Sequence, residues 1–199
     1  MKTADVIIVG SGASGLFNAL FLPQDYKVIV ITKKEVEESD SFLAQGGISA
    51  LKNPEDYDSY FEDTMKAGHY ENDKGAVEKM IKESPQIIQD LKDFGVRFDL
   101  KDGEIEFTRE GGHSTFRILH HEDLTGKEIT SHLYEEAKKR DNITIMENCT
   151  MIDIIEKDGE CKGIVYKDAD GNLDTIEAPD TVLATGGLGG LFKHSTNFR

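Results

Sequence analysis

A run of β-branched residues that ends in regularly spaced glycines constrains this chain more than any other feature. Val6–Val9 stops at Gly10, Gly12 and Gly15 follow, and an apolar run of helical composition continues to Leu22. A strand, a tight turn and a helix with the spacing G-x-G-x-x-G are typical of dinucleotide binding. The first glycine permits the turn, the second lets backbone approach a pyrophosphate, and the third lets helix and strand pack closely. The alternative is a glycine-rich turn in an ordinary α/β protein.

Composition narrows the class of protein. The chain has 199 residues, 38% hydrophobic and 31% charged, which is typical of a soluble globular protein with one large or two small domains. A net charge of −15 argues against nucleic-acid binding. No run is long enough to cross a membrane, and the first strand begins too early for a signal peptide. Cys149 and Cys161 fit neither a disulfide framework nor a metal site, so we expect reduced thiols and a cytoplasmic protein.

The second strand lacks the residue that an NAD-binding unit needs. Lys27–Lys33 predicts a buried strand parallel to the first, and an acidic residue at its end would bind the ribose hydroxyls of NAD. The strand instead ends in Lys33 and Lys34, and Glu35 is the nearest acid. This weighs against an NAD-dependent dehydrogenase, which stays as an alternative. The lysine could lie beside a ribose or near a phosphate.

Two helices and a hairpin are expected in the middle of the chain, after a loop at Ser39–Gly47. The small side chains and paired glycines of this loop would let backbone amides approach a ligand, although it could be a plain connector. Pro54–Tyr70 has helical periodicity. Lys74–Gly95 is also helical, with a predicted break at Ser84-Pro85. Val96–Leu100 and Glu104–Phe107 predict the hairpin.

A dense group of titratable residues follows in the segment 108–126. Loops rich in such residues are where functional sites tend to lie, and this one holds Arg109, Glu110, His113, Arg117, His120, His121 and Asp123. No spacing gives a metal triad, because the adjacent histidines should point to opposite faces of an extended segment. No metal is therefore predicted. Thr125 and Glu128 have the spacing of a capping box that opens a helix to about Arg140.

The remainder of the chain is rich in strands. Ile143–Met146 predicts one strand, and three segments joined by Asp-Gly turns predict an antiparallel meander: Met151–Glu156, Gly163–Tyr166 and Leu173–Ala178. Thr181–Ala184 then runs into Thr185-Gly186-Gly187, so a second strand ends in glycines.

Four motifs occur here in one order: VIIVGSGASG, SDSFLAQGG, REGGHS with RILHHEDLTG, and VLATGG. Together they resemble the flavoprotein subunit family of fumarate reductase and succinate dehydrogenase, and within it the branch that oxidises L-aspartate. The resemblance covers essentially all 199 residues. It implies an α/β fold, a Rossmann-like FAD-binding domain with a parallel sheet plus an antiparallel β-meander. Residues 1–199 would form the N-terminal part of a longer protein, without its capping and substrate domain and its C-terminal FAD segment.

The resemblance also implies which residues bind FAD. Those around the pyrophosphate would be Gly10, Ser11, Gly12, Ala13, Ser14 and Gly15, with Lys33 near the adenosine ribose. The flavin side would be lined by Asp40, Ser41, Phe42, Leu43, Ala44, Gln45, Gly46 and Gly47, and the ADP half would be closed over by Thr185 and Gly186. Asp40 stands where quinone-linked members usually carry a histidine attached covalently to FAD. A non-covalent FAD is therefore expected.

The implied activity is FAD-dependent oxidation of L-aspartate to iminoaspartate, the first step of quinolinate and NAD biosynthesis, with the flavin reoxidised by oxygen or fumarate. Glu110 would pair with the substrate ammonium and repel a third carboxylate. His113 is the second catalytic candidate, and Thr125 falls in the same region. Besides the dicarboxylate substrate, quinolinate synthase is an expected partner. The alternatives are an FAD-binding module without turnover and a soluble flavoprotein of the fumarate reductase or succinate dehydrogenase type. The base and further substrate-binding residues are expected beyond Arg199.

Overall fold

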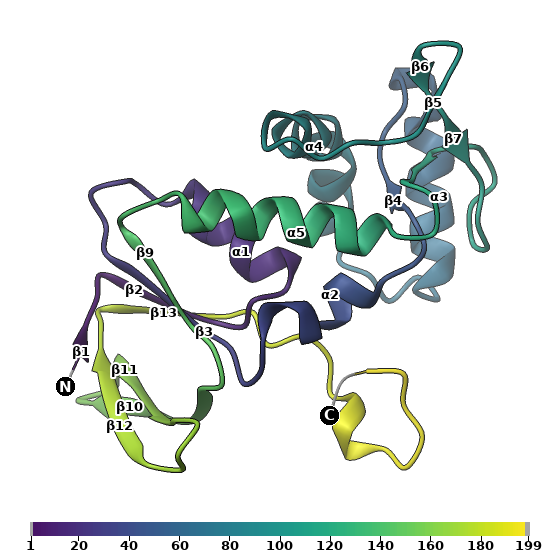
Figure 1. Ribbon diagram of the computed structural model, residues 1–199. Helices are drawn as coiled ribbons and strands as arrows, with labels where there is room; N and C mark the ends of the chain where they lie inside the picture. Colours follow the sequence, from purple (N-terminus) through teal and green to yellow (C-terminus); the bar gives the residue numbers. More distant parts are fainter. Residues whose placement is uncertain (1, 198–199) are drawn as a thin grey trace. The chain divides into compact units, whose positions relative to one another are not determined.

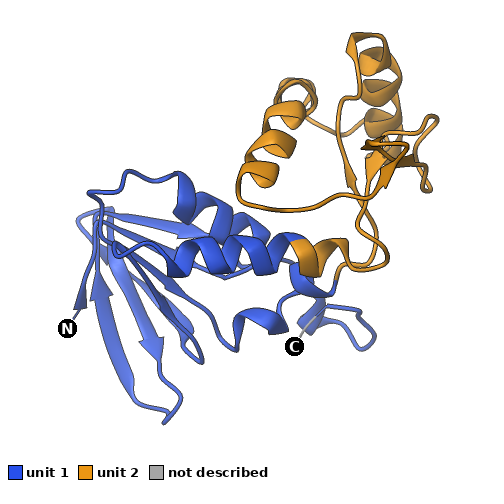
Figure 2. Cartoon of the chain, turned by 45° about the horizontal axis from the view of Figure 1, so that its top comes forward, with its two compact units in different colours: residues 1–43, 129–199 blue, residues 44–128 orange. Residues whose placement is uncertain are grey.

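The computed structural model describes residues 2–197 and divides the chain into two compact units. Unit 1 comprises residues 1–43 and 129–199, and unit 2 comprises residues 44–128 (Figure 2). Among the described residues, no helix is long and apolar enough to span a membrane.

A parallel sheet forms the centre of unit 1. Its strands lie in the order β13 (Asp180–Leu183), β2 (Val6–Val9), β3 (Val28–Ile31) and β9 (Ile143–Met146), and every neighbouring pair is parallel. All four residues of β2 and of β3 are buried, as expected for strands covered on both faces. Helix α1 (Ala13–Phe21) follows β2 (Figure 1). These elements confirm the strand–turn–helix and parallel-strand predictions.

The second sheet of unit 1 contains the predicted meander. Its order is β1 (Lys2–Thr3), β12 (Leu173–Glu177), β11 (Glu160–Lys167) and β10 (Thr150–Lys157), with β10, β11 and β12 antiparallel. One hydrophobic cluster joins the two sheets, with Ile7 and Ile31 of the parallel sheet and Ile164 and Ile176 of the meander fully buried in it. The predicted α/β architecture is therefore confirmed, and its core lies between the sheets.

The segment predicted as a loop after β3 contains short helices. The 3-10 turn η1 (Val36–Glu38) precedes α2 (Asp40–Leu43), so the loop prediction was wrong at residues 40–43. Ser39 explains the difference, since its hydroxyl accepts the Phe42 N–H at 3.3 Å and satisfies a free donor at the helix start. A further 3-10 turn, η3 (Gly189–Leu191), follows β13.

Unit 2 consists of helices and short strands. The 3-10 turn η2 (Pro54–Asp56) leads into α3 (Tyr57–Ala67), and α4 is Lys74–Asp93. One sheet has the order β4 (Ile48–Ser49), β8 (Ile118–Leu119) and β7 (Phe107–Thr108), and the predicted hairpin is formed by β5 (Leu100–Lys101) and β6 (Glu104–Ile105). Tyr60, Met65, Val77 and Ile81 form a buried cluster between α3 and α4.

Helix α4 is continuous through Pro85, so the predicted break at Ser84-Pro85 was wrong. Proline has no N–H to donate to the carbonyl of Ile81, four residues earlier. The Ser84 hydroxyl donates to that carbonyl instead, at 2.7 Å, and accepts the Leu51 N–H at 2.8 Å. The serine thus satisfies the acceptor that the proline leaves open. The helix ends as predicted before Gly95, which has a φ of +90°.

The capping box predicted at Thr125 and Glu128 does not form. Helix α5 (Thr125–Lys138) begins at Thr125 itself, and the Glu128 N–H donates to the Leu124 carbonyl at 2.9 Å. The Thr125 hydroxyl accepts the N–H of His121, and the Glu128 carboxylate accepts the backbone and side-chain N–H groups of Arg97. The side chains of Thr125 and Glu128 therefore bind other parts of the chain and do not bind each other's backbone, as a capping box requires. Residues 129–138 of this helix belong to unit 1.

Candidate functional site

Two glycines in the turn of unit 1 leave no room for a side chain. Gly10 has a φ of +115°, and a Cβ there would lie 2.2 Å from the Ala184 carbonyl oxygen. A Cβ on Gly15 would lie 2.0 Å from the Gly10 carbonyl oxygen. The Ala184 N–H also donates to Val9 at 2.8 Å. The end of β13 therefore lies against the turn, and the structure explains two of the three glycines by packing alone.

Ser41 of α2 lies at the start of α1. Its hydroxyl accepts the Ala13 N–H at 3.0 Å, and a Cβ on Gly12 would lie 2.9 Å from the same oxygen. Gly12 caps the helix without a side-chain hydrogen bond. Ser14 in the first turn is exposed. The N-terminal end of α1 thus brings together two of the predicted cofactor-binding segments.

Ser11 carries a polar atom that the protein leaves unsatisfied. The residue is 2% exposed, and its hydroxyl oxygen has no hydrogen-bond partner among the described residues. A buried hydroxyl without a partner is unfavourable, so such groups in native proteins call for an explanation. Next to a helix N-terminus, a bound phosphate would supply the missing partner.

Other predicted cofactor residues of unit 1 follow strand ends. Lys33 comes after β3 and is exposed, and Thr185 and Gly186 come after β13 and are exposed. Because β2, β3 and β13 are parallel, their carboxyl ends lie at one edge of the sheet, where open α/β sheets bind ligands. Asp40 accepts a hydrogen bond from the Asn197 side chain at 3.0 Å. Phe42 is half-buried and Leu43 exposed.

Unit 2 contains a cleft of about 390 Å³. Its lining comes from three segments of the chain: Gln45, Gly46, Gly47, Thr108, Glu110, His120, Glu122 and Asp123. The Gly47 N–H donates to the Glu110 carboxylate at 3.2 Å, and a Cβ on Gly46 would lie 3.2 Å from that carboxylate. The structure thus joins Glu110 to the end of the predicted flavin segment. Ala44, just before the cleft, accepts the Gly126 N–H at 2.9 Å.

A fully buried arginine anchors the segment that carries Glu110. Arg117 is 0% exposed and donates to both carboxylate oxygens of Asp56, at 2.8 and 2.9 Å, and to Asp63 at 2.6 Å. Its guanidinium lies over the Tyr60 ring, 4.8 Å from the centroid. The hydrogen bond from Arg117 lowers the pKa of Asp56 to about 2, and the same bond raises the pKa of Arg117. Sequence reasoning missed the two aspartates. Their separation of seven residues, two helical turns, was the available signal.

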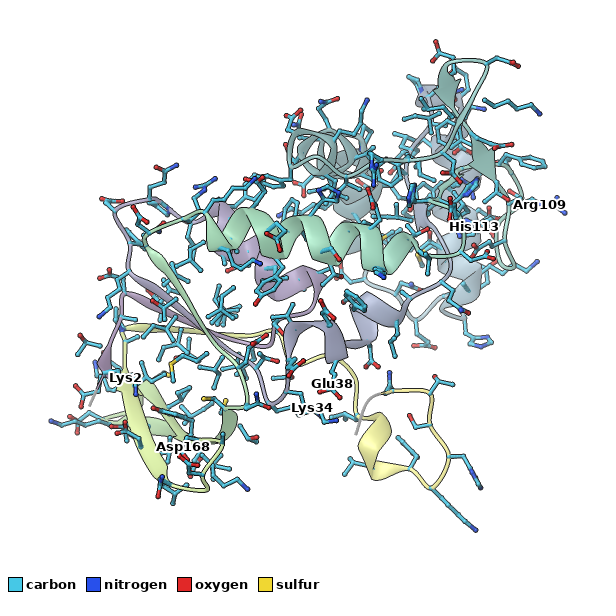
Figure 3. All side chains as sticks on the ribbon, in the orientation of Figure 1. Lys2, Lys34, Glu38, Arg109, His113 and Asp168 are labelled. Carbon is cyan, nitrogen blue, oxygen red and sulfur yellow. The ribbon has the colours of Figure 1, made fainter. Side chains whose placement is uncertain are left out.

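His113 belongs to this arginine network and does not line the cleft. Its Nδ1 lies 3.0 Å from Nη1 of Arg117, and its ring packs 6.1 Å from that of Tyr60. The neighbouring Ser114 donates its N–H and hydroxyl to Asp63. Figure 3 shows Arg109 and His113 on the loop between β7 and β8. The two catalytic candidates from the sequence, Glu110 and His113, therefore have different surroundings.

His120 and His121 do not point to opposite faces, contrary to expectation. Both Nδ1 atoms lie near the carboxylate of Asp99, at 3.2 Å for His120 and 3.3 Å for His121. The strand ends at Leu119, and the next residues wrap around Asp99, which also accepts the Glu122 N–H at 2.8 Å. Within residues 2–197, no group of three His, Cys, Asp or Glu residues is arranged to hold a metal ion. Cys149 and Cys161 are free thiols, as predicted.

Comparison with known proteins gives consistent matches. Residues 5–199 match the FAD binding domain family. The chain is 44% identical over 198 residues to an L-aspartate oxidase of Clostridium perfringens and 45% identical over 196 residues to one of Clostridium acetobutylicum. The two matches cover 100% and 98% of this chain but only 45% of each relative. Its structure superposes on the FrdA chain of an E. coli quinol fumarate reductase variant with a TM-score of 0.93 and 28% identity, covering 100% of this chain and 35% of that one.

Proposed function

The chain belongs to the FAD binding domain family, whose cofactor is FAD, and on that premise we propose that it is the N-terminal part of an FAD-dependent oxidase of L-aspartate. The proposed product is iminoaspartate, the first intermediate toward quinolinate and NAD, and oxygen or fumarate reoxidises the flavin. The support is the similarity to the two clostridial L-aspartate oxidases over essentially the whole chain. We also propose a cytoplasmic location and quinolinate synthase as the protein that receives the product.

The features of unit 1 fit FAD. The unpartnered Ser11 hydroxyl and the N-terminal end of α1 suit a pyrophosphate, because a helix N-terminus presents free N–H groups and a partial positive charge. In the proposal, residues 10–15 hold the pyrophosphate, Lys33 lies near the ribose, and Thr185 and Gly186 cover the ADP half. Asp40 cannot form the covalent link that a histidine forms, so the FAD is non-covalent.

The observation that carries the substrate assignment is the Glu110 cleft. Its carboxylate is held by the Gly47 N–H, in a cleft whose charged residues are otherwise Glu122 and Asp123. A fixed carboxylate pairs with an ammonium group and repels an additional carboxylate, which favours L-aspartate over plain dicarboxylates. FAD, when bound, would be the oxidant that accepts a hydride from the substrate carbon. The chain's own residues bind and orient the substrate, and His113 lies on the same β7–β8 loop as Glu110.

A spectroscopic titration tests the proposal. The purified chain is expected to carry a visible flavin band, and acid precipitation is expected to release the flavin into the supernatant. L-Aspartate should perturb or bleach the band under anaerobic conditions, and succinate should do so less. Glu110→Gln should reduce this preference, whereas Glu104→Gln in the β5–β6 hairpin should not.

The outcomes separate the alternatives. A flavin band that aspartate perturbs but does not bleach supports a binding module without turnover. A preference for succinate over aspartate supports the fumarate reductase or succinate dehydrogenase type. A chain that binds NADH and no flavin contradicts the proposal.

A further inference from the structure

His120, rather than His113, is the histidine of the Glu110 cleft. His120 lines the cleft together with Glu110, whereas His113 lies in the arginine network. Asp99 is not part of the cleft lining. His120 therefore lines the cleft while its Nδ1 lies 3.2 Å from Asp99.

Asp99 lies beside both the ring and the backbone of His120. Its Oδ2 lies 3.2 Å from His120 Nδ1, and its backbone N–H donates to the His120 carbonyl at 2.8 Å. The Glu122 N–H donates to the same Oδ2 at 2.8 Å. The backbone of His120 and of Glu122 is thus hydrogen-bonded to the residue that lies beside Nδ1.

The charge of Asp99 favours one of the two neutral tautomers of His120. With a carboxylate oxygen 3.2 Å from Nδ1, the tautomer that carries its proton on Nδ1 is the more favourable one. Its Nε2 is then an unprotonated acceptor. His113 has the opposite arrangement, because arginine can only donate and Nδ1 of His113 must accept from Arg117.

We propose that His120, oriented by Asp99, is a specificity-determining residue of the Glu110 cleft, and that its Nε2 accepts a hydrogen bond from the ammonium group of an amino dicarboxylate. An ammonium group has three donors, and Glu110 and His120 supply two acceptors of different charge. The charged residues of the cleft lining, Glu110, Glu122 and Asp123, all favour a cationic group. This inference rests on the proposed function and deepens it.

Nitrogen NMR of histidine-labelled chain tests the tautomer without any turnover. At neutral pH, the His120 resonances should show a protonated Nδ1 and an unprotonated Nε2, and His113 should show the reverse. L-Aspartate should shift the Nε2 resonance of His120, and succinate should shift it less. A His120 with its proton on Nε2, or one that responds equally to both ligands, would overturn the inference.

Binding measurements on the FAD-loaded chain test the role. His120→Leu should lower the ratio of aspartate affinity to succinate affinity about ten- to hundredfold, as expected for a hydrogen bond to a charged group. His121→Leu is the matched control, because His121 also lies beside Asp99 but does not line the cleft, and it should leave the ratio unchanged. Asp99→Asn should lower the ratio less than His120→Leu and alter the nitrogen resonances of His120.

The failures are distinguishable. If the chain binds aspartate in preference to succinate and His120→Leu keeps that preference, the inference fails and the proposed function stands. If the FAD-loaded chain binds neither dicarboxylate, the proposed function fails and the inference fails with it.

Discussion

The glycine turn of unit 1 and the Glu110 cleft of unit 2 are both candidate binding regions, but they differ in the groups that form them. The turn consists mainly of backbone, and most of it lies within six consecutive residues, with one serine left unpartnered. The cleft is lined by residues from three segments of the chain, and a buried arginine anchors the segment that carries its central carboxylate. The glycine turn therefore depends on the absence of side chains, whereas the cleft depends on the ion pairs of Arg117 with Asp56 and Asp63.

Removing the arginine should have the largest effect, and it should break the cleft alone. Arg117→Met leaves Asp56 and Asp63 without their partner in a buried setting, which costs about 3–5 kcal/mol of unfolding free energy. Urea unfolding measures the loss. Arg97→Met is the control, because Arg97 is 72% exposed and its ion pair should contribute less than about 1 kcal/mol. Equal effects of the two variants would contradict the proposed dependence of the cleft on Arg117.

A methyl group at residue 15 should instead destabilise unit 1 and disrupt the glycine turn. A Cβ at residue 15 would lie 2.0 Å from a backbone oxygen, so backbone must move, and we expect Gly15→Ala to cost about 3 kcal/mol and to abolish FAD binding. Urea unfolding and flavin fluorescence measure the two effects. Gly111→Ala, where nothing lies within 4 Å of the added Cβ, should be nearly neutral. A stable, FAD-binding Gly15→Ala protein would show that the packing is less strict than described.

Acid should weaken the anchor of the cleft before it affects the turn. The pKa of Asp56 is about 2 in the folded chain, lowered by Arg117, and about 3.9 in an unfolded chain. Its contribution of about 2.6 kcal/mol is therefore fully present above about pH 5 and is lost progressively as the pH falls from about 5 to about 1. Unfolding free energies measured across this range should decline. Asp56→Asn should flatten this part of the profile, and an unchanged slope would contradict the assignment.

The smallest effect should come from the unpartnered serine. Ser11→Ala removes a buried hydroxyl without a hydrogen bond, so stability should stay equal or rise by up to about 1 kcal/mol, while FAD affinity falls about five- to tenfold. Flavin fluorescence titration measures the affinity. Thr130→Val is the matched control, because it removes another buried, unpartnered hydroxyl in α5, outside the turn, and should leave FAD affinity unchanged. Equal FAD affinity of Ser11→Ala and the native chain would remove Ser11 from the cofactor site.

The elements of unit 1 were predictable because their signals are local. Four consecutive β-branched residues followed by glycines predict a buried strand and a turn, and Asp-Gly turns mark the meander. Two of the errors occurred where a partner distant in sequence acts on a side chain. Ser84 keeps α4 continuous while it holds the Leu51 N–H, and Arg97 takes the Glu128 carboxylate away from the capping box.

The sequence by itself determined the fold class, the position of the glycine turn and the resemblance to a flavoprotein family, because short-range periodicity and motif order carry that information. It also singled out Glu110. Only the tertiary structure decided that His120 and not His113 lines the Glu110 cleft, and which aspartates partner Arg117. Hydrogen bonds and ion pairs between distant segments form only after the chain has folded, and no spacing along the chain specifies the orientation of a histidine ring.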